Sequence, residues 1–310
     1  MPELPDLEIY REALTRRFVG APLVQIRLGS PFVLRSVKPP LDQVRGRSVV
    51  AIRRIGKRIV WDLEGEFFAV VHLMIAGRFH EKPLGAKLAQ RGGLAAFDGE
   101  RASVHLTEAG SQRRAWLRMV QGGEALRALD PGGVEPIGLS QSAFAVALTR
   151  ENRTLKRALT DPRLFAGIGN SYSDEILHRA RLSPFARTGE LAVEKIARLH
   201  TAVDQTLTEA TERIRREVGD SFPEKVTAFR PDMAVHGRFG LPCPVCGTAI
   251  QRVVYAQNEA NYCPTCQTDG KLLADRALSQ LLRGDWPKTL EELEERKRSL
   301  ATSSPSAESG

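Results

Sequence analysis

The four cysteines of the chain lie in two close pairs, Cys243 with Cys246 and Cys263 with Cys266. The 16 residues between the pairs fit the spacing of a four-thiolate zinc site. Each C-x-x-C turn directs two thiolates toward one ion, and four soft ligands complete a tetrahedron that leaves no position for water. We therefore expect one structural Zn²⁺ per chain. Two independent redox pairs are the alternative interpretation.

The N-terminal sequence MPELPDLE carries a second set of reactive groups. A small second residue permits removal of Met1, which would leave Pro2 with a free secondary amine. Such an amine attacks an electrophilic carbon and forms an iminium directly, and α-amino groups titrate closer to neutrality than lysine does. Glu3 stands beside it as a general acid. The alternative is that this segment only begins a helix, with Pro5 in the first turn.

The composition indicates a partner with dense negative charge. The chain has 310 residues, which at roughly 150 residues per domain predicts about two domains. Its 45 Lys and Arg against 37 Asp and Glu give a net charge of +8, which favours nucleic acid or an anionic membrane surface. No apolar run reaches the roughly 18 residues of a membrane-spanning helix, and the first residues do not resemble a secretory signal. We expect a cytoplasmic protein.

The elements that position these groups change along the chain. The first 130 residues hold short apolar or alternating runs between Gly, Pro and charged turns, as in a sandwich or barrel. Before these runs, the apolar spacing between Pro5 and Val19 predicts an amphipathic helix. The breaker-rich segment 130–136 marks the main domain boundary.

Beyond that boundary the pattern becomes helical. Short helices are expected after the cap Ser140 and around 155–159, then a glycine turn at 165–170, a further helix, and a long helix over 189–217. Between the cysteine pairs we expect a β-hairpin with its turn near Gln257–Glu259. The predicted fold is α+β and multi-domain: an N-terminal β-sandwich with an N-terminal helix (1–130), a helical domain (131–237), a zinc ribbon (238–268), and a helical extension with a disordered tail (269–310).

Five segments, in this order, resemble motifs of the formamidopyrimidine-DNA glycosylase and endonuclease VIII (Fpg/Nei) family of base-excision repair enzymes. They cover most of the chain up to about residue 268 and together are highly specific. They are MPELPDLE at the N-terminus, GKR at 56–58, HLMIAGRF at 72–79, LKRALTDPRLFAGIGNSYSDEIL at 155–177, and VHGRFGLPCPVCG at 235–247 with NYCPTC at 261–266.

The resemblance implies the chemistry of a DNA glycosylase with apurinic/apyrimidinic lyase activity on oxidised or ring-opened bases. In the family the N-terminal proline, here Pro2, attacks C1′ of the damaged nucleotide. The adjacent glutamate, Glu3, assists sugar opening, and the lysine, Lys57, contacts the phosphate beside the lesion. The base must first be turned out of the stack, at a cost of a few kcal/mol.

The resemblance also implies a helix–two-turn–helix domain and a set of DNA-contacting residues. In the 165–170 turn, Gly167 and Gly169 would let the backbone approach a phosphate, with an amide side chain capping the next helix. A side chain of the 72–79 segment would fill the gap left by the extruded base. The DNA-contacting set is Asp6, His72, Ile75, Lys156, Asn170 and Asn258.

The chain departs from the family pattern at three places. Asp6 stands where the family usually has glutamate. Asn258 occupies the position of an arginine that grips phosphate from the zinc-finger hairpin. The segment 108–117 lacks the phenylalanine expected among the void-filling residues. These changes leave open which lesion is accepted and identify a divergent member of the family.

Two rival functions remain open from the sequence. A damage binder on the same fold, non-catalytic or stopping after base removal, would bind abasic duplex without cutting it. A zinc-ribbon interaction or transcription factor would show no preference for damaged DNA. The expected partner is double-stranded DNA with damaged bases or abasic sites, bound by a monomer.

Overall fold

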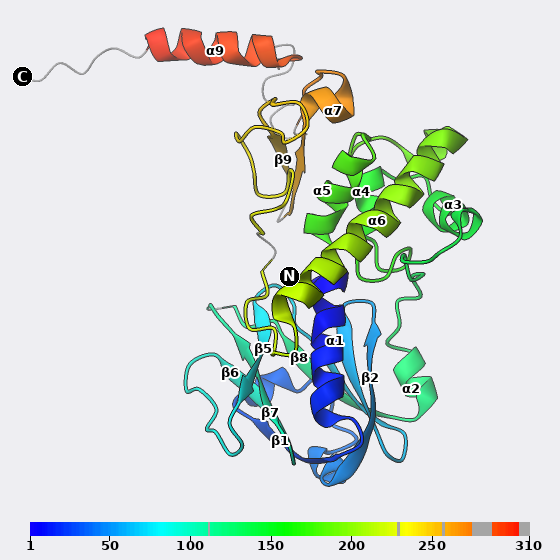
Figure 1. Cartoon of the computed structure of the whole chain (residues 1–310), viewed down its shortest axis with the longest axis vertical. Coiled ribbons are helices and arrows are strands. Elements are labelled where there is room, and N and C mark those ends of the chain that lie inside the picture. The colour runs from blue at the N-terminus through cyan, green and yellow to red at the C-terminus, as the bar shows by residue number, and fades with distance from the viewer. Residues whose placement is uncertain (111, 228–229, 256–257, 275–286, 304–310) are drawn as a thin grey trace, which may run out of the picture. The chain divides into compact units, whose positions relative to one another are not determined.

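The computed structural model describes residues 1–110, 112–227, 230–255, 258–274 and 287–303. The chain forms two compact units, each discontinuous in sequence (Figure 1). The four predicted domains divide the chain differently, and their boundaries stay a prediction. Unit 1 comprises Met1–Leu148, Leu159–Gly169 and Val203–Ala228; unit 2 comprises Thr149–Ala158, Asn170–Ala202 and Phe229–Gly310.

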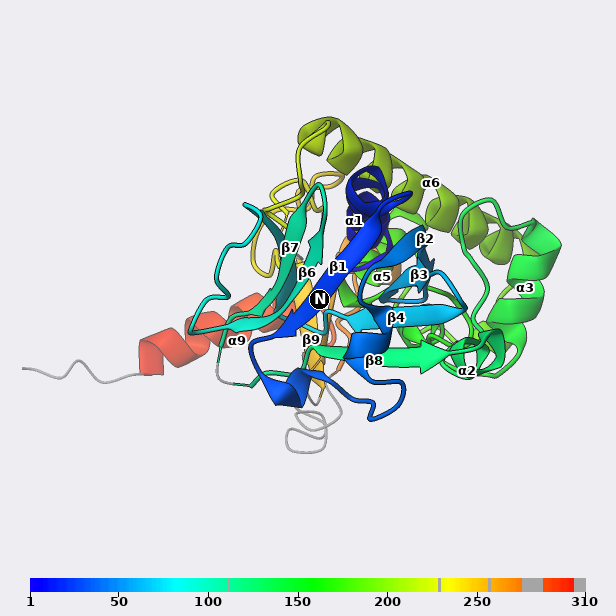
Figure 2. The ribbon, with the colours of Figure 1, turned by 90° about the horizontal axis from the view of Figure 1, so that it is seen from below.

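Unit 1 contains the predicted β-sandwich. Two antiparallel four-stranded layers, β5-β7-β6-β1 and β2-β3-β4-β8, join where β1 pairs with β2 (Figure 2). The β1–β2 pairing is short, which lets the sheet fold over on itself. The strands are β1 (Pro22–Leu28), β2 (Arg47–Ile55), β3 (Arg58–Leu63), β4 (Phe67–His72), β5 (Gly77–Lys82), β6 (Gly93–Gly99), β7 (Ser103–Glu108) and β8 (Trp116–Gln121).

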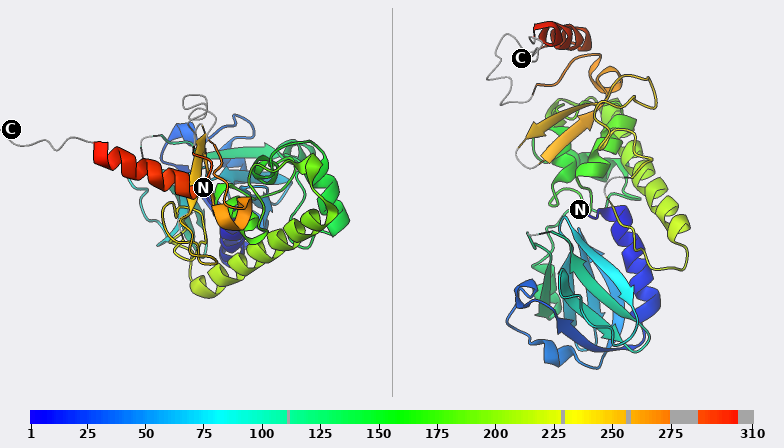
Figure 3. Two further views of the ribbon diagram at one scale, coloured as in Figure 1. Left: turned by 90° about the horizontal axis from the view of Figure 1, so that it is seen from above. Right: turned by 90° about the vertical axis from the view of Figure 1, so that its left-hand side faces the viewer.

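The sandwich core holds the two layers together through large side chains. The Trp61 ring of β3 stacks on the Phe97 ring of β6, with centroids 4.4 Å apart. Helix α1 (Leu4–Phe18) lies along the sandwich (Figure 3) and buries Leu7 and Leu14 in the same core. This packing anchors the N-terminal residues, because α1 starts directly after Glu3.

The helices follow the predicted order. Ser140 caps α3 as expected, since its Oγ accepts the Ala143 N–H. Helix α6 begins in unit 2 and ends in unit 1. The remaining helical segments are η1 (Pro31–Val33), η2 (Leu41–Val44), α2 (Gly123–Arg127), α3 (Gln141–Thr149), α4 (Leu155–Thr160), α5 (Asn170–Arg179), η3 (Thr188–Glu190) and α6 (Val193–Val218).

The cysteine module in unit 2 contains the hairpin of β9 (Gln251–Tyr255) and β10 (Asn258–Tyr262), followed by α7 (Pro264–Thr268). The predicted turn at Gln257–Glu259 is wrong in register, because Asn258 pairs with Tyr255 inside the hairpin. Strand pairing continues to Tyr255 and Asn258, so Asn258 and Glu259 belong to β10 and not to the turn. Residues 256–257 lie outside the described part. Strand β10 packs against α5 (Figure 3).

The sequence did not predict two of the strands, and it predicted the C-terminal region in part. Strands β5 and β8 were not expected; β5 (GRFHEK) is rich in charged residues, whereas β8 (WLRMVQ) contains a single one, Arg118. The predicted helix over 290–300 is α9 (Leu290–Ser303). The helix expected over 273–282 and the disordered tail fall mostly outside the described residues. In the described part of the chain, no helix is both long and apolar enough to span a bilayer.

Candidate functional site

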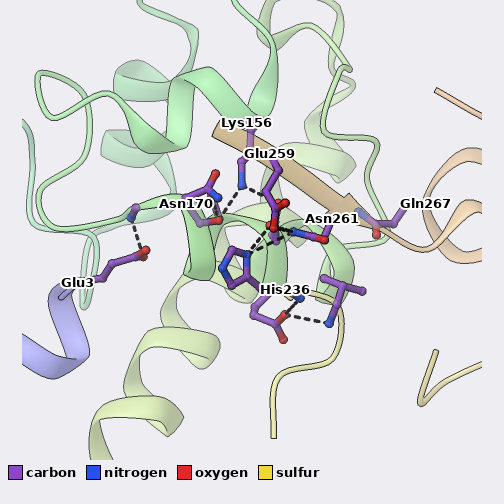
Figure 4. Close-up of polar contacts among 12 residues, drawn as sticks. Glu3, Lys156, Asn170, His236, Glu259, Asn261 and Gln267 are labelled. Carbon is purple, nitrogen blue, oxygen red and sulfur yellow. Dashed lines mark hydrogen bonds and ion pairs between the residues drawn. The ribbon is translucent and has the colours of Figure 1, made fainter. Parts of the chain in front are cut away.

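The start of α1 brings three of the predicted catalytic groups together in unit 1. Pro2 and Glu3 are buried, and the Gly169 N–H donates to Glu3 Oε2 at 2.7 Å (Figure 4). A Cβ atom on Gly169 would lie 2.5 Å from Glu3 Oε1 and 2.7 Å from Lys57 Nζ. The carboxylate and the ammonium therefore crowd one backbone position, close to the end of the chain that would carry the free amine.

The chain terminus lies in an environment that favours an uncharged amine. Burial lowers the pKa of the Met1 amino group below 8, the Glu3 carboxylate opposes this shift, and Arg78 adds to the lowering. Lys57 lowers this pKa further. An unprotonated amine is the form that acts as a nucleophile.

The glycine turn at 165–170 contacts the start of α1. Gly167 adopts the left-handed region at φ +82°, and its carbonyl accepts the Leu4 N–H at 3.0 Å. Gly169 needs space rather than a special conformation, because the Glu3 carboxylate fills the position of its absent Cβ. Within unit 1 this backbone thus approaches the Glu3 carboxylate, and the expected approach to a phosphate stays a prediction.

Asp6 is buried and serves the helix start. Its Oδ2 accepts the Glu3 backbone N–H at 3.1 Å, and the Glu3 side chain faces the Asp6 N–H, which completes a capping box. The chain uses this shorter carboxylate to fix the backbone that carries Glu3. A direct DNA contact by Asp6 stays a prediction.

His72 and Ile75 lie at the end of β4. The Met74 N–H donates to His72 Nδ1 at 2.9 Å, so a neutral imidazole carries its proton on Nε2. Burial, with help from Arg58 and Lys57, lowers the pKa of His72 to about 4. Ile75 is 59% exposed, as a wedge residue would be. Neither contact with DNA is tested by the structure.

Lys156 and Asn170 lie side by side in unit 2. Lys156 is only 1% exposed, and its Nζ donates to the Asn170 carbonyl at 2.7 Å and to Asp174 Oδ1 at 2.5 Å (Figure 4). A buried, ion-paired lysine does not present its charge to solvent in this state. Asn170 opens α5, and among the described residues its side-chain amide has no hydrogen-bond partner.

The four predicted cysteines form a metal site. Their sulfur atoms all lie within 4.8 Å of one another, with Cys243 and Cys266 Sγ 4.0 Å apart and Cys246 and Cys263 Sγ 3.4 Å apart. Tetrahedral Zn–S bonds of about 2.3 Å place sulfurs about 3.8 Å apart, so the set fits one structural zinc. His178 Nε2 lies 3.3 Å from Cys243 Sγ and supports this ligand.

The hairpin residue Asn258 is placed only by its backbone, at the first position of β10. Its side chain falls outside the described part of the chain, and its role toward DNA stays a prediction. The neighbouring Glu259 is partly buried, and its Oε1 accepts from Asn261 Nδ2 at 2.9 Å.

A cationic cluster around Trp116 was not expected as such. Arg58, His72 and Trp116 are register partners on β3, β4 and β8. The Cζ atoms of Arg58 and Arg118 lie 5.7 and 5.8 Å from the Trp116 ring centroid. The Nε atoms of both arginines are buried without a hydrogen-bond partner among the described residues. Two positive charges next to one ring form a place where an anion could bind. Arg58 and Arg118 are far apart in sequence, and only the pairing of β3, β4 and β8 brings them together.

Three family models match the chain in succession. The formamidopyrimidine-DNA glycosylase N-terminal domain matches residues 1–131, the formamidopyrimidine-DNA glycosylase H2TH domain matches 133–220, and the zinc finger found in FPG and IleRS matches 240–268. The matched segments contain, respectively, the residues predicted to be catalytic, the turn before α5 and the four cysteines.

Similar proteins span the same region. The formamidopyrimidine-DNA glycosylase of Thermus thermophilus is 35% identical over 279 residues, covering 87% of this chain and all of that protein. An uncharacterised glycosylase-like protein of Mycobacterium tuberculosis is 43% identical over 157 residues, 51% of this chain and 96% of its own length. The T. thermophilus crystal structure matches at TM-score 0.72 and 33% identity, covering 86% of this chain and 98% of its own. The Lactococcus lactis protein bound to abasic-site DNA shares the fold at TM-score 0.76 and 23% identity, covering 86% and 99%.

Proposed function

The chain belongs to the formamidopyrimidine-DNA glycosylase and endonuclease VIII (Fpg/Nei) family, and on that premise we propose that it is a base-excision repair glycosylase with apurinic/apyrimidinic lyase activity. Its substrate is duplex DNA that carries oxidised or ring-opened bases or abasic sites. The observation that carries this proposal is the approach of Glu3 and Lys57 to Gly169, with Pro2 next to Glu3 in sequence, at a terminus whose amine is held toward its neutral form.

The first step is displacement of the damaged base. After removal of Met1, the Pro2 nitrogen donates its lone pair to C1′ and forms a bond to it. The glycosidic bond between C1′ and the nitrogen of the damaged base breaks. The electron pair of that bond passes to the base, which leaves after taking up a proton. The burial that lowers the pKa of the Met1 amine supports a neutral proline nitrogen at the same place.

The second step is strand cleavage. The Glu3 carboxylate accepts the proton that the proline nitrogen loses and passes it to O4′ as the C1′–O4′ bond breaks, which leaves an iminium between the nitrogen and C1′. The iminium acidifies the C2′ proton, and loss of that proton to a base expels the 3′ phosphate. Water then hydrolyses the iminium and frees Pro2. Lys57 holds the phosphate beside the lesion during these steps.

The basic groups supply phosphate contacts that do not read sequence. Among the described residues, the side-chain amide of Asn170 and the buried Nε atoms of Arg58 and Arg118 have no hydrogen-bond partner. Binding to DNA should therefore weaken steeply with salt, because each phosphate contact releases counterions. Affinity that does not change with salt would argue against these groups as the DNA surface.

The test is borohydride trapping of the cell-processed protein on abasic duplex DNA, with intact mass recorded on the same sample. We expect a covalent adduct that maps to the N-terminal peptide beginning at Pro2. Glu3→Gln keeps the shape of the side chain but removes the proton donor, and it should slow trapping by about 100-fold. An adduct on any other peptide would overturn the proline mechanism.

A damaged-DNA binder on the same fold is the second candidate, favoured by the uncharged Asn258 in the hairpin. It predicts preferential binding of abasic duplex with no adduct, although mass shows that Pro2 is free. Equal affinity for intact and abasic duplex would contradict both candidates.

A further inference from the structure

A buried carboxylate in unit 2 joins three elements that are separate in sequence. Asp174 of α5 is 1% exposed. Its Oδ1 accepts from Lys156 Nζ at 2.5 Å, and its Oδ2 accepts from His236 Nδ1 at 2.8 Å and from Asn261 Nδ2 at 3.2 Å. Figure 4 shows these side chains converging from α4, the segment before the zinc site, and β10.

On one side, this carboxylate is connected to the first turn of α5. The Lys156 ammonium that pairs with Asp174 also donates to the Asn170 carbonyl at 2.7 Å, and Ser173 Oγ donates to the same oxygen at 3.0 Å. In an α-helix this carbonyl also accepts the N–H of residue 174. The orientation of the first peptide of α5 thus depends on where Asp174 holds the lysine.

On the other side, the carboxylate is connected to the zinc hairpin. Asn261 donates from β10 to Asp174 and to Glu259 Oε1. The residue after Asp174, Glu175, accepts three successive backbone N–H groups, those of Ala234, Val235 and His236, at 2.7–3.0 Å. α5 therefore fixes both the hairpin and the segment that leads to the first cysteine.

We propose that Asp174 is a positioning residue, which couples the zinc hairpin to the first turn of α5 and so sets how Asn170 meets a DNA phosphate. This inference rests on the proposed function, because it assigns the phosphate to Asn170. Lys156 acts in the same way: it orients the Asn170 peptide from inside the protein. Buried polar groups that hydrogen-bond to one another in this way favour one arrangement among several.

The test is a double-mutant cycle between the hairpin and the helix start, with Asn261→Ala and Asn170→Ala. Asn261→Ala removes one donor to Asp174 and leaves the Lys156–Asp174 pair in place. We expect it to weaken binding to abasic-site duplex by about fivefold in the parent protein and by less than about twofold in the Asn170→Ala background. Gln251→Ala on β9 is the matched control, since that side chain contacts only Ala249 among the described residues, and it should change neither background.

Additive effects would overturn the inference, because a purely structural role of Asn261 would weaken both backgrounds equally. Zinc content, measured on the same samples, should stay at one per chain in every variant. Loss of zinc from Asn261→Ala would also count against the inference, since the effect would then pass through the metal site.

A second measurement needs no DNA and separates this inference from the proposed function. Amide hydrogen exchange of the peptide that covers α5 should be faster in Asn261→Ala than in Gln251→Ala, because the Asp174 N–H reports on the first turn. Unchanged exchange overturns the coupling. Faster exchange in a protein that does not prefer abasic over intact duplex keeps the coupling and rejects the glycosylase function.

Discussion

Helices α1 and α5 begin in the same physical situation, because the first N–H groups of a helix have no partner within it and favour an anion. In α1 the chain supplies that anion itself, through the capping box of Glu3 and Asp6. The first turn of α5 contains no acidic residue and begins with Asn170. The comparison shows one helix start neutralised from within and one that suits an external phosphate.

The largest expected effect, on the rate of covalent trapping, comes from displacing Glu3 at the start of α1. Gly169→Ala would place a Cβ atom 2.4 Å from Glu3 Cδ and 2.7 Å from Lys57 Nζ. Both groups must move, and misplacement by about 1 Å costs about 100-fold in rate. We expect borohydride trapping on abasic duplex to slow by about that factor, while DNA affinity changes much less.

The control for this variant is Gly138→Ala in the same unit. Gly138 has φ +71° and open space around its Cβ position, so the substitution adds backbone strain without displacing a catalytic group. Its trapping rate should equal that of the parent protein. Equal slowing in the two variants would assign the effect to strain.

The sequence predicted the parts of this comparison that depend on local pattern. The helix after Glu3, the strand runs and the cysteine spacing follow from periodicity and ligand geometry, and the structure confirms them. The partners of Asp174 could not be predicted, because Lys156, His236 and Asn261 lie far apart in sequence and only the packing of α5 brings them together. Likewise, the sequence assigned Gly169 to a close approach to a phosphate, whereas its contact with the Glu3 carboxylate follows only from the fold.

His72 is a third polar group whose hydrogen-bonding capacity is taken up within the protein, because its Nδ1 accepts the Met74 N–H. Its pKa is lowered from 6.5 to about 4 in the folded protein. The unfolded chain therefore binds more protons between these values, so stability should rise with pH from about 4 to about 6.5 and level off above. The titration of His72 should change the free energy of unfolding by about 1–2 kcal/mol across this range, after allowance for its partial contact with solvent.

The measurement for His72 is urea unfolding at pH 7.5, 5.5 and 4.5, compared with His72→Gln. As the pH falls, the free energy of unfolding should decrease more in the parent protein than in the variant, because glutamine does not titrate. A constant difference across this range would show that the imidazole is not held neutral by the fold.

Asn170→Asp would convert the start of α5 into a copy of the start of α1. The new carboxylate lies at the positive end of the helix, so the free energy of unfolding should rise by about 0.5 kcal/mol. The same charge repels a phosphate, and affinity for abasic duplex should fall by about tenfold at low salt. The opposite signs distinguish this result from general damage to the fold, in which stability and affinity would fall together. Asn170→Ala, which adds no charge, should lose affinity without gaining stability.

The reverse change, made in α1, is Asp6→Ala, and it is expected to lower stability. This variant removes the acceptor of the Glu3 N–H, and loss of a helix cap costs about 1 kcal/mol. Urea unfolding should show a lower midpoint with an unchanged slope, since the surface exposed on unfolding stays the same. Asp42→Ala is the control, because Asp42 is exposed and its side chain makes no hydrogen bond within the described residues; its midpoint should not move. If both midpoints fall equally, the loss reflects net charge, and α1 does not depend on its own carboxylates at its start.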